Sequence, residues 1–283
     1  MAFRKILVPI DGSDIQRAPL SLAFALAGRY AAAVDVLHAR IDPTEAASFV
    51  AEGMSGEVIQ ELIDLTAQQS VTRASAARAM FEAACAQGGI SEGPPAAAGA
   101  SARYIEELAR EEEAVVRLGR LADLTVVSRP AAHLDPATQS TLNASLFESG
   151  HPVLVPAKTG TEVPFRHVLI AWNGSAEAAR AVSCALPLLV EAETVAIAAS
   201  AADPDDEAAA EPLIEYLGLH SVVAGVHQLP EHHAVGEALL DAAVGFDLMV
   251  MGAYTHSRLW QLILGGVTRQ MLEQAPLALF MAH

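Results

Sequence analysis

Short apolar segments alternate with longer amphipathic segments along the whole chain. In the first half, the apolar segments are residues 6–10, 34–37, 95–98, 124–127 and 153–155. In the second half, they are residues 168–172, 194–199, 222–226, 248–251 and 277–281. Short apolar strands separated by amphipathic helices are typical of βαβ units, in which helices cover both faces of a parallel sheet. The pattern therefore predicts an α/β fold with about five strands in each half.

The two halves also begin with the same sequence. Residues 4–13 read RKILVPIDGS, and residues 166–175 read RHVLIAWNGS. Each stretch has a basic residue, an apolar run and a polar-Gly-Ser turn, and each leads into an Ala-rich segment with helical character. An internal repeat of this length indicates two copies of one domain.

The ends of the two halves match as well. ADLTVVS, residues 122–128, corresponds to FDLMVMG, residues 246–252, and HPVLVPA at 151–157 corresponds to APLALFM at 275–281. The first half is the longer one, and we expect its extra residues around 42–72, which form a polar stretch with helical character.

We therefore predict two tandem domains, residues 1–157 and residues 165–283, joined by the polar linker AKTGTEVPF. Each domain should contain an open, parallel, five-stranded sheet with helices on both faces. The last strand of each half is short and apolar, and an uncovered apolar edge invites pairing. We expect these two edges to pair within the chain, which would make the halves a pseudo-dimer, and we leave open whether two chains also form a homodimer.

Charge and composition narrow the classes of function. The chain of 283 residues has 34 acidic and 17 basic residues, a net charge of −17. Such a surface repels nucleic acid and anionic membranes, so we expect neither as a partner. No segment approaches 18 uninterrupted apolar residues, and the sequence predicts a cytoplasmic protein. The two cysteines, Cys85 and Cys184, are expected to be buried thiols and not ligands or a disulfide.

Candidate chemistry lies where strands of each half end, because ligands of open parallel sheets bind beyond the carboxyl ends of the strands. The first strand of each half is followed by a turn, Asp11-Gly12-Ser13 in one and Asn173-Gly174-Ser175 in the other. These turns could also simply start a helix, since Ser, Asp and Asn are good helix caps. Both interpretations stay open from the residues alone.

Three stretches carry a resemblance to a known family. ILVPIDGSD at the start, DLMVMGAYTHSRLWQLILGGVTRQML at 247–272 and the closing APLALFM resemble the universal stress protein family, in a tandem arrangement that covers nearly the whole chain. The resemblance implies an adenine nucleotide alpha hydrolase-like fold. It also implies a way of binding ATP that many members share: an acidic residue after the first strand and a G-x2-G-x9-G-S/T loop after the fourth. Members without that loop do not bind ATP.

Neither half has the whole motif. The first half keeps the acid, Asp11, but its loop positions are Ser128, Ala131, Thr141 and Leu142, so no loop glycine is present. Glycine lets a backbone approach a phosphate closely, and these residues offer no such approach. The resemblance therefore implies no nucleotide in the first half.

The second half keeps more of the loop. Its corresponding residues are Asn173 in place of the acid, Gly252, Thr255, Gly265 and Gly266. Asn173 could bond a ribose or a base without charge, and the glycines could expose backbone N–H groups to phosphate. Nearby Thr268 could supply the hydroxyl that Gly266 lacks. If ATP or another adenine nucleotide binds, we expect it in the second domain only.

Two functions remain open from the sequence. One is a stress-response protein that binds an adenine nucleotide through its second domain. The other is a scaffold or interaction module that binds a protein or an apolar small ligand and no nucleotide. No catalytic residue is assigned, because no general base or triad is visible, and no metal site is expected from His220, His227, His232 and His233.

Overall fold

The computed structural model describes residues 2–44, 55–95, 99–130, 136–158, 160, 163–200, 204–230, 234–253 and 266–283. By contacts, the chain divides into one unit of Arg4–Val126 and another of Met1–Phe3 with Val127–His283. This division follows contacts and not the sequence repeat, so the domain limits 1–157 and 165–283 stay a prediction. Each unit is described by itself below.

The unit Arg4–Val126 is a parallel sheet with helices. Its elements are β1 (Lys5–Pro9), the short 3-10 helix η1 (Asp14–Gln16), α1 (Arg17–Tyr30), β2 (Ala33–Arg40), α3 (Gly56–Gly88), β3 (Ser101–Leu108), α4 (Glu111–Gly119) and β4 (Leu124–Val126). The strand order is β3-β2-β1-β4, and all these pairs are parallel. The central strand β1 is buried apart from its first residue, which explains its unbroken apolar sequence.

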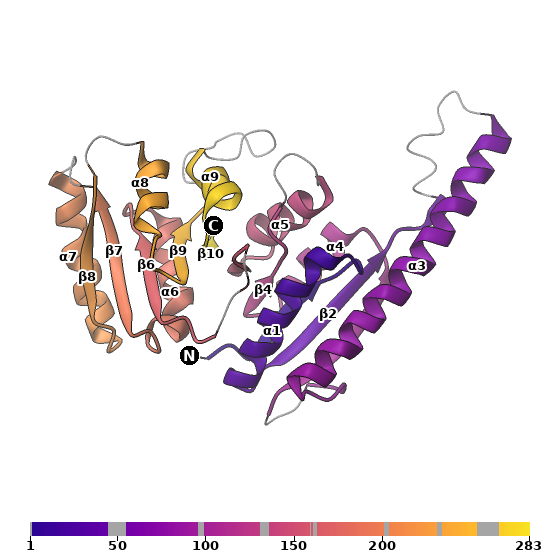
Figure 1. Ribbon diagram of the computed structural model, residues 1–283, viewed down its shortest axis with the longest axis horizontal. Helices are drawn as coiled ribbons and strands as arrows, with labels where there is room; N and C mark the ends of the chain where they lie inside the picture. The colour runs from indigo at the N-terminus through magenta and orange to yellow at the C-terminus, as the bar shows by residue number, and fades with distance from the viewer. Residues whose placement is uncertain are drawn as a thin grey trace. The chain divides into compact units, whose positions relative to one another are not determined.

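The unit Val127–His283 contains the rest. Its elements are α5 (Pro136–Glu148), β5 (Val153–Val155), β6 (His167–Ala171), α6 (Ala176–Leu189), β7 (Thr194–Ser200), α7 (Pro204–Leu219), β8 (Ala224–Leu229), α8 (Val235–Ala242), β9 (Leu248–Gly252), α9 (Gly266–Gln274) and β10 (Ala278–Ala282). The strand order is β5-β10-β9-β6-β7-β8. Figure 1 labels the elements of both units.

The order of strands is the same around the first strand of each half. β1 lies between β2 and β4, and β6 lies between β7 and β9. These registers make Ile6 and Leu124 neighbours in one half, and Val168 and Leu248 neighbours in the other. The expected α/β fold with a largely parallel sheet is confirmed. One pairing is antiparallel: β5 runs against β10, with Leu154 opposite Phe280, which confirms that the two apolar edges pair. Pairing between two chains stays a prediction.

A pair of aspartates repeats with the fold. Asp123, just before β4, accepts hydrogen bonds from the N–H groups of Arg4 and Lys5, at 2.7 and 2.9 Å. Asp247, just before β9, accepts the same two bonds in the second half, from Arg166 and His167, both at 2.9 Å. A carboxylate therefore fixes the start of the first strand to the start of the fourth in both copies.

Two strands at the sheet edges lie elsewhere than the sequence pattern predicts. The third strand is Ser101–Leu108, and of the strand expected at residues 95–98, residues 96–98 lie outside the described ones. In the second half, the strand expected at 222–226 is found at Ala224–Leu229. Both are edge strands with exposed positions, so neither needs the continuous apolar run by which buried strands are recognised.

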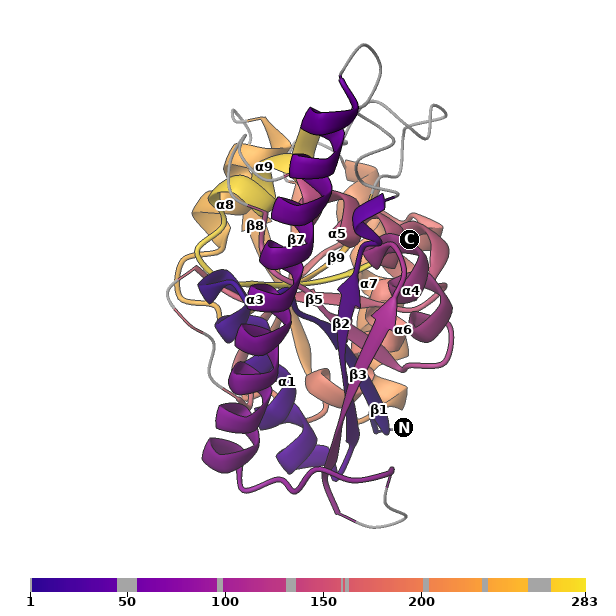
Figure 2. The same cartoon turned by 90° about the vertical axis from the view of Figure 1, so that its right-hand side faces the viewer.

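The helix α3 accounts for part of the extra length of the first half. It has 33 residues, about 50 Å of helix, and begins at a Ser55 cap whose side chain accepts the N–H of Val58. Its buried residues are Ala77, Met80 and Phe81, all toward its C-terminal end. Figures 1 and 2 show the N-terminal turns of α3 extending past the strands of the same unit. Among the described helices, none combines the length and the apolar character that a membrane span requires.

Candidate functional site

The turn after β6 is the most open part of the expected site. Oδ1 of Asn173 accepts the N–H of Ser175 at 3.2 Å, and Oγ of Ser175 accepts the N–H of Ala178 at 3.1 Å. Gly174 has φ 69°, and no described atom lies within 4 Å of the Cβ it would carry. The turn thus caps α6, as the alternative interpretation proposed. The Asn173 side chain is exposed, and its amide nitrogen has no hydrogen-bond partner among the described residues.

Gly252, at the end of β9, packs against the start of α6. A Cβ on Gly252 would lie 2.5 Å from the backbone N of Ala178 and 2.8 Å from the carbonyl C of Glu177. Both are backbone atoms, which cannot move aside without displacing the helix. Close packing alone therefore favours glycine at position 252, whether or not a ligand binds there. Close packing here places the end of β9 directly beside the turn that holds Asn173.

Gly266 is the first residue of α9 that the structure describes, because residues 254–265 before it lie outside the described chain. Thr268, two residues on, is only 4% exposed, and it has a hydrogen-bond or other polar partner within the protein. Its hydroxyl is thus less available to a ligand than the sequence suggested. Thr255 and Gly265, the other expected site residues, lie outside the described part of the chain.

The corresponding turn of the first half is covered. Oδ1 of Asp11 accepts the N–H of Ser13 at 2.8 Å, so the acid shapes its own turn. A Cβ on Gly12 would lie 2.7 Å from the carbonyl O of Arg73 and 2.9 Å from the N of Ala77, both on α3. The backbone of the long helix therefore closes the side of this turn that is open at Gly174.

The loop positions of the first half are also different. Thr141 and Leu142 correspond to Gly265 and Gly266, but they lie in the middle of α5 and are buried. The helix of the first half thus begins several residues earlier, and no helix start is present where a phosphate would need one. Ser128, which corresponds to Gly252, is 5% exposed, and its hydroxyl has no hydrogen-bond partner among the described residues. Ala131 lies outside them.

A buried histidine beside the covered turn was missed in the sequence. His38 on β2 is 2% exposed, and its Nδ1 is 2.9 Å from the carbonyl O of Ile10. A carbonyl only accepts, so Nδ1 carries the proton, and Nε2 has no partner within the described structure. In the second half, the matching register position is Ala199. In the sequence, His38 is only one of three polar residues in the segment VDVLHAR, which also contains Asp35 and Arg40.

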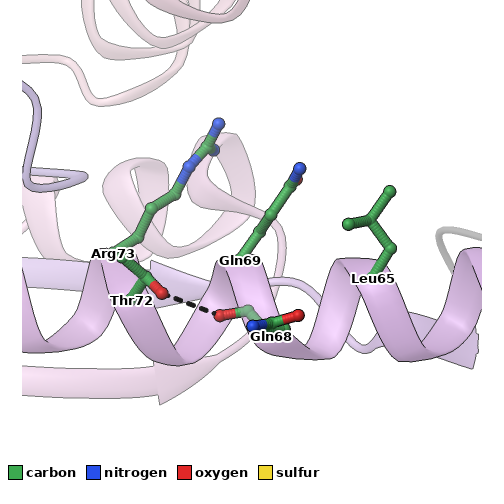
Figure 3. Close-up of a pocket in the computed structure, with 5 residues that line it drawn as sticks. All are labelled: Leu65, Gln68, Gln69, Thr72 and Arg73. Atoms are coloured by element: carbon green, nitrogen blue, oxygen red, sulfur yellow. Dashed lines mark hydrogen bonds between the residues drawn. The ribbon is translucent and has the colours of Figure 1, made fainter.

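A shallow hollow of about 540 Å³ runs along the exposed part of α3. It is lined by Leu65, Gln68, Gln69, Thr72 and Arg73, and Figure 3 shows Arg73, Gln69 and Leu65 directed to the same side of the helix. The hydroxyl of Thr72 donates to the carbonyl of Gln68 at 3.0 Å, so it is occupied within the helix. The hollow is mixed in character, with one apolar side chain and one cation.

The other candidate groups form no site in the described structure. No group of three or more His, Cys, Asp or Glu side chains in these residues is placed to hold a metal ion. The rings of His220 and His227 contact Tyr216 and Phe246, while residues 232 and 233 lie outside the described chain. Cys85 and Cys184, expected to be buried, are only partly buried, and this partial burial raises the pKa of both thiols.

The geometry is that of an α/β protein whose sheet is mostly parallel and is packed against helices. Residues 2–116 match the model of the Universal stress protein family. Residues 2–116, which are less than half of the chain, are thus similar to this family. The match ends before β4, ahead of the loop positions that have lost their glycines.

Solved structures share this fold over nearly the whole chain. A universal stress protein from Archaeoglobus fulgidus DSM 4304 is similar with a TM-score of 0.67 and 17% identity, covering 98% of this chain and 97% of its own. A protein classed as a universal stress protein, from Pseudomonas aeruginosa UCBPP-PA14, is similar with a TM-score of 0.56 and 14% identity, covering 99% and 93%. Identities this low establish the fold and not the function. No curated protein matches the chain.

Proposed function

We propose that the protein is a stress-response protein that binds an adenine nucleotide, ATP in the first instance, at the second copy of the fold. Asn173 would contact the ribose or the base, and the backbone near Gly252, Gly265 and Gly266 would receive the phosphates. No catalytic group is included, so the proposed activity is binding and not hydrolysis. A cytoplasmic location is part of the same proposal.

The observation that carries the proposal is that α9 is described from Gly266 onward, so the expected phosphate loop leads directly into this helix. A helix start offers unpaired backbone N–H groups and the positive end of the helix dipole, which together favour a phosphate. An acidic chain can bind an anion in this way without a basic side chain. The open turn at Gly174 and the exposed amide of Asn173 also favour a binding site at this end of the strands.

One observation favours the second function, a scaffold that binds another protein. Three apolar side chains of α3 are about half exposed: Val58 at 46%, Leu65 at 51% and Val71 at 58%. A long helix that exposes apolar residues away from its own sheet is a surface that a protein partner can cover. This function does not need a nucleotide, so the two proposals differ in what they require of ATP.

Calorimetric titration with ATP and Mg²⁺ separates them. Replacing Gly265 and Gly266 by Val should abolish binding, because each lost hydrogen bond to a charged phosphate costs about 1.5–3 kcal/mol. The matched control, Asp11→Ala, changes the corresponding edge of the first half and should leave the affinity unchanged. Absence of ATP binding by the unmodified protein would favour the scaffold, and equal loss in both variants would contradict the placement in the second copy.

A further inference from the structure

Arg129 is a cation held by carbonyl groups alone. Its Nε donates to the carbonyl of Pro156 at 3.1 Å, and its two terminal nitrogens donate to those of Met271 at 3.1 Å, Leu272 at 2.9 Å and Leu277 at 2.7 Å. No carboxylate of the described chain forms an ion pair with it. Burial lowers the pKa of Arg129 to about 10, which still leaves it charged at neutral pH.

The partners of Arg129 identify what it fixes. Met271 and Leu272 lie in the last turn of α9. The Met271 carbonyl also accepts the N–H of Ala275 at 2.9 Å, so Arg129 is its second donor. A guanidinium there satisfies carbonyls and meets the negative end of the helix dipole. Lys158 adds a second cation at the same end, donating to the carbonyl of Glu273. Two residues that follow strands of the first copy therefore hold the C-terminal end of a helix in the second.

Arg129 lies at the point of the first copy that corresponds to the start of the nucleotide loop. Arg129 directly follows Ser128, where the nucleotide loop of the first copy would begin. The corresponding residue of the second copy is Ala253, whose backbone bonds, among the described residues, to Ala282 and His283 of that copy. This segment of the first copy has no loop glycine, and its residue Arg129 contacts α9, the helix described from Gly266 onward.

We propose that Arg129 is a positioning residue: it clamps the C-terminal end of α9 and thereby holds the helix start at Gly266 in the orientation that a phosphate requires. The clamp concerns α9 itself, while its effect on a nucleotide rests on the function proposed above. It makes the ligand edge of the second copy depend on a residue of the first copy that does not touch the ligand. Lys158 assists at the same end with a more exposed side chain.

Hydrogen exchange without any nucleotide tests the clamp directly. Arg129→Met should speed exchange of the α9 amides by about tenfold or more, because four bonds to a charged group are lost together, while the amides of β6 and β9 keep their protection. The control is Arg269→Met, which removes an arginine from the same helix whose Nε pairs with Glu273 at 2.8 Å on the surface. It should leave exchange unchanged. Arg129→Lys keeps the charge with fewer donors and should give an intermediate rate.

Titration of the same variants with ATP tests the consequence. Arg129→Met should weaken binding about 3- to 30-fold, the usual range for a residue that acts through a packed element, and Arg269→Met should not. Unchanged exchange in α9 of Arg129→Met would overturn the clamp, as would equal acceleration throughout the unit, which would show a merely general loss of stability. If the unmodified protein binds no ATP, the proposed function fails, and the exchange rates of α9 still decide whether Arg129 positions it.

Discussion

The turn that follows the first strand is built from similar residues in the two copies but is used differently. In both, a side-chain oxygen two residues before Ser accepts the serine N–H, from Asp11 in one and from Asn173 in the other. Gly12 is then covered by the backbone of α3, whereas Gly174 has no described atom near it. Similar local sequence therefore gives a closed edge or an open one, depending on a helix far along the chain. The motif therefore predicts the turn, but it does not predict whether a ligand can reach that turn.

The two glycines of these turns offer the strongest way to break the comparison. Gly12→Ala combines a positive φ of 86° with a Cβ placed 2.7 Å from a backbone oxygen of α3. We expect a loss of about 3–4 kcal/mol in the free energy of unfolding, from strain and overpacking together. Gly174→Ala, with φ 69° and open space, should lose only about 1 kcal/mol. Urea unfolding of both variants measures the difference, and equal losses would show that α3 does not cover the first turn.

A buried ion cluster also distinguishes the copies. Asp35 is fully buried and pairs with Lys5 at 3.0 Å and with Arg103 at 2.7 Å. In the second copy, Ala196 occupies the position of Asp35, and Gly225 occupies that of Arg103. The second copy therefore has no ion cluster at this place. In the first copy, the two ion pairs link β1 and β3 to the buried Asp35 carboxylate on β2, although the Arg103 side chain is partly exposed.

Removing one cation of this cluster should be costly. Arg103→Met should lower the free energy of unfolding by about 2–3 kcal/mol, because a buried carboxylate is left with one partner, and the partial exposure of Arg103 reduces the full cost. In the Arg103→Met variant, the second change Asp35→Asn should restore part of the lost free energy of unfolding. Denaturant unfolding with exposed Arg110→Met as the control provides the measurement. No recovery in the double variant would mean that the charge on Asp35 does not cause the loss.

The end of the fourth strand gives a third contrast. Gly252→Ala should destabilise by about 2 kcal/mol, because its Cβ would meet the first turn of α6. Ser128→Ala at the corresponding position should be neutral or slightly stabilising, because it removes a buried hydroxyl that has no partner among the described residues. Thermal unfolding of the two variants decides it. A larger loss at Ser128 would mean that its hydroxyl makes a bond that matters.

The smallest expected effect concerns alkaline pH in the first copy alone. Burial, together with the nearby Glu106 carboxylate, raises the pKa of Tyr104 to about 12. An unfolded tyrosine loses its proton near pH 10, so this tyrosine stabilises the fold fully below about pH 10 and loses that contribution as the pH rises toward 12. Tyr104→Phe should make stability fall less steeply between these values. Identical pH profiles for the two proteins would show that burial does not shift this group.

The sequence predicted the fold well for a physical reason. Buried parallel strands such as β1 and β6 need continuous apolar residues, and the repeated turn and the repeated apolar ends locate both copies. The edge strand β3 was misplaced because its exposed positions permit the charged residues Arg103 and Glu106. Local patterns are informative where burial dictates the residue, and much less so at an edge.

The candidate site was predicted only in part. Asn173, Gly252 and Gly266 lie at the expected strand and helix ends, but the sequence could not reveal that Gly252 packs on α6 or that Thr268 is buried. The closed state of the first turn depends on α3, and the clamp on α9 depends on Arg129, which is distant from it in sequence. Contacts between remote segments leave no periodic signal, so these features require the structure.

The central claim is that a nucleotide binds at the second copy and not at the first. Hydrogen exchange with mass spectrometry, in the presence and absence of saturating ATP and Mg²⁺, tests it in one experiment. Bound ATP should slow exchange in the turn at 173–178 and at the start of α9, while residues 10–16 should exchange at the same rate with and without it. Protection at residues 10–16, or equal protection in both turns, would contradict the account.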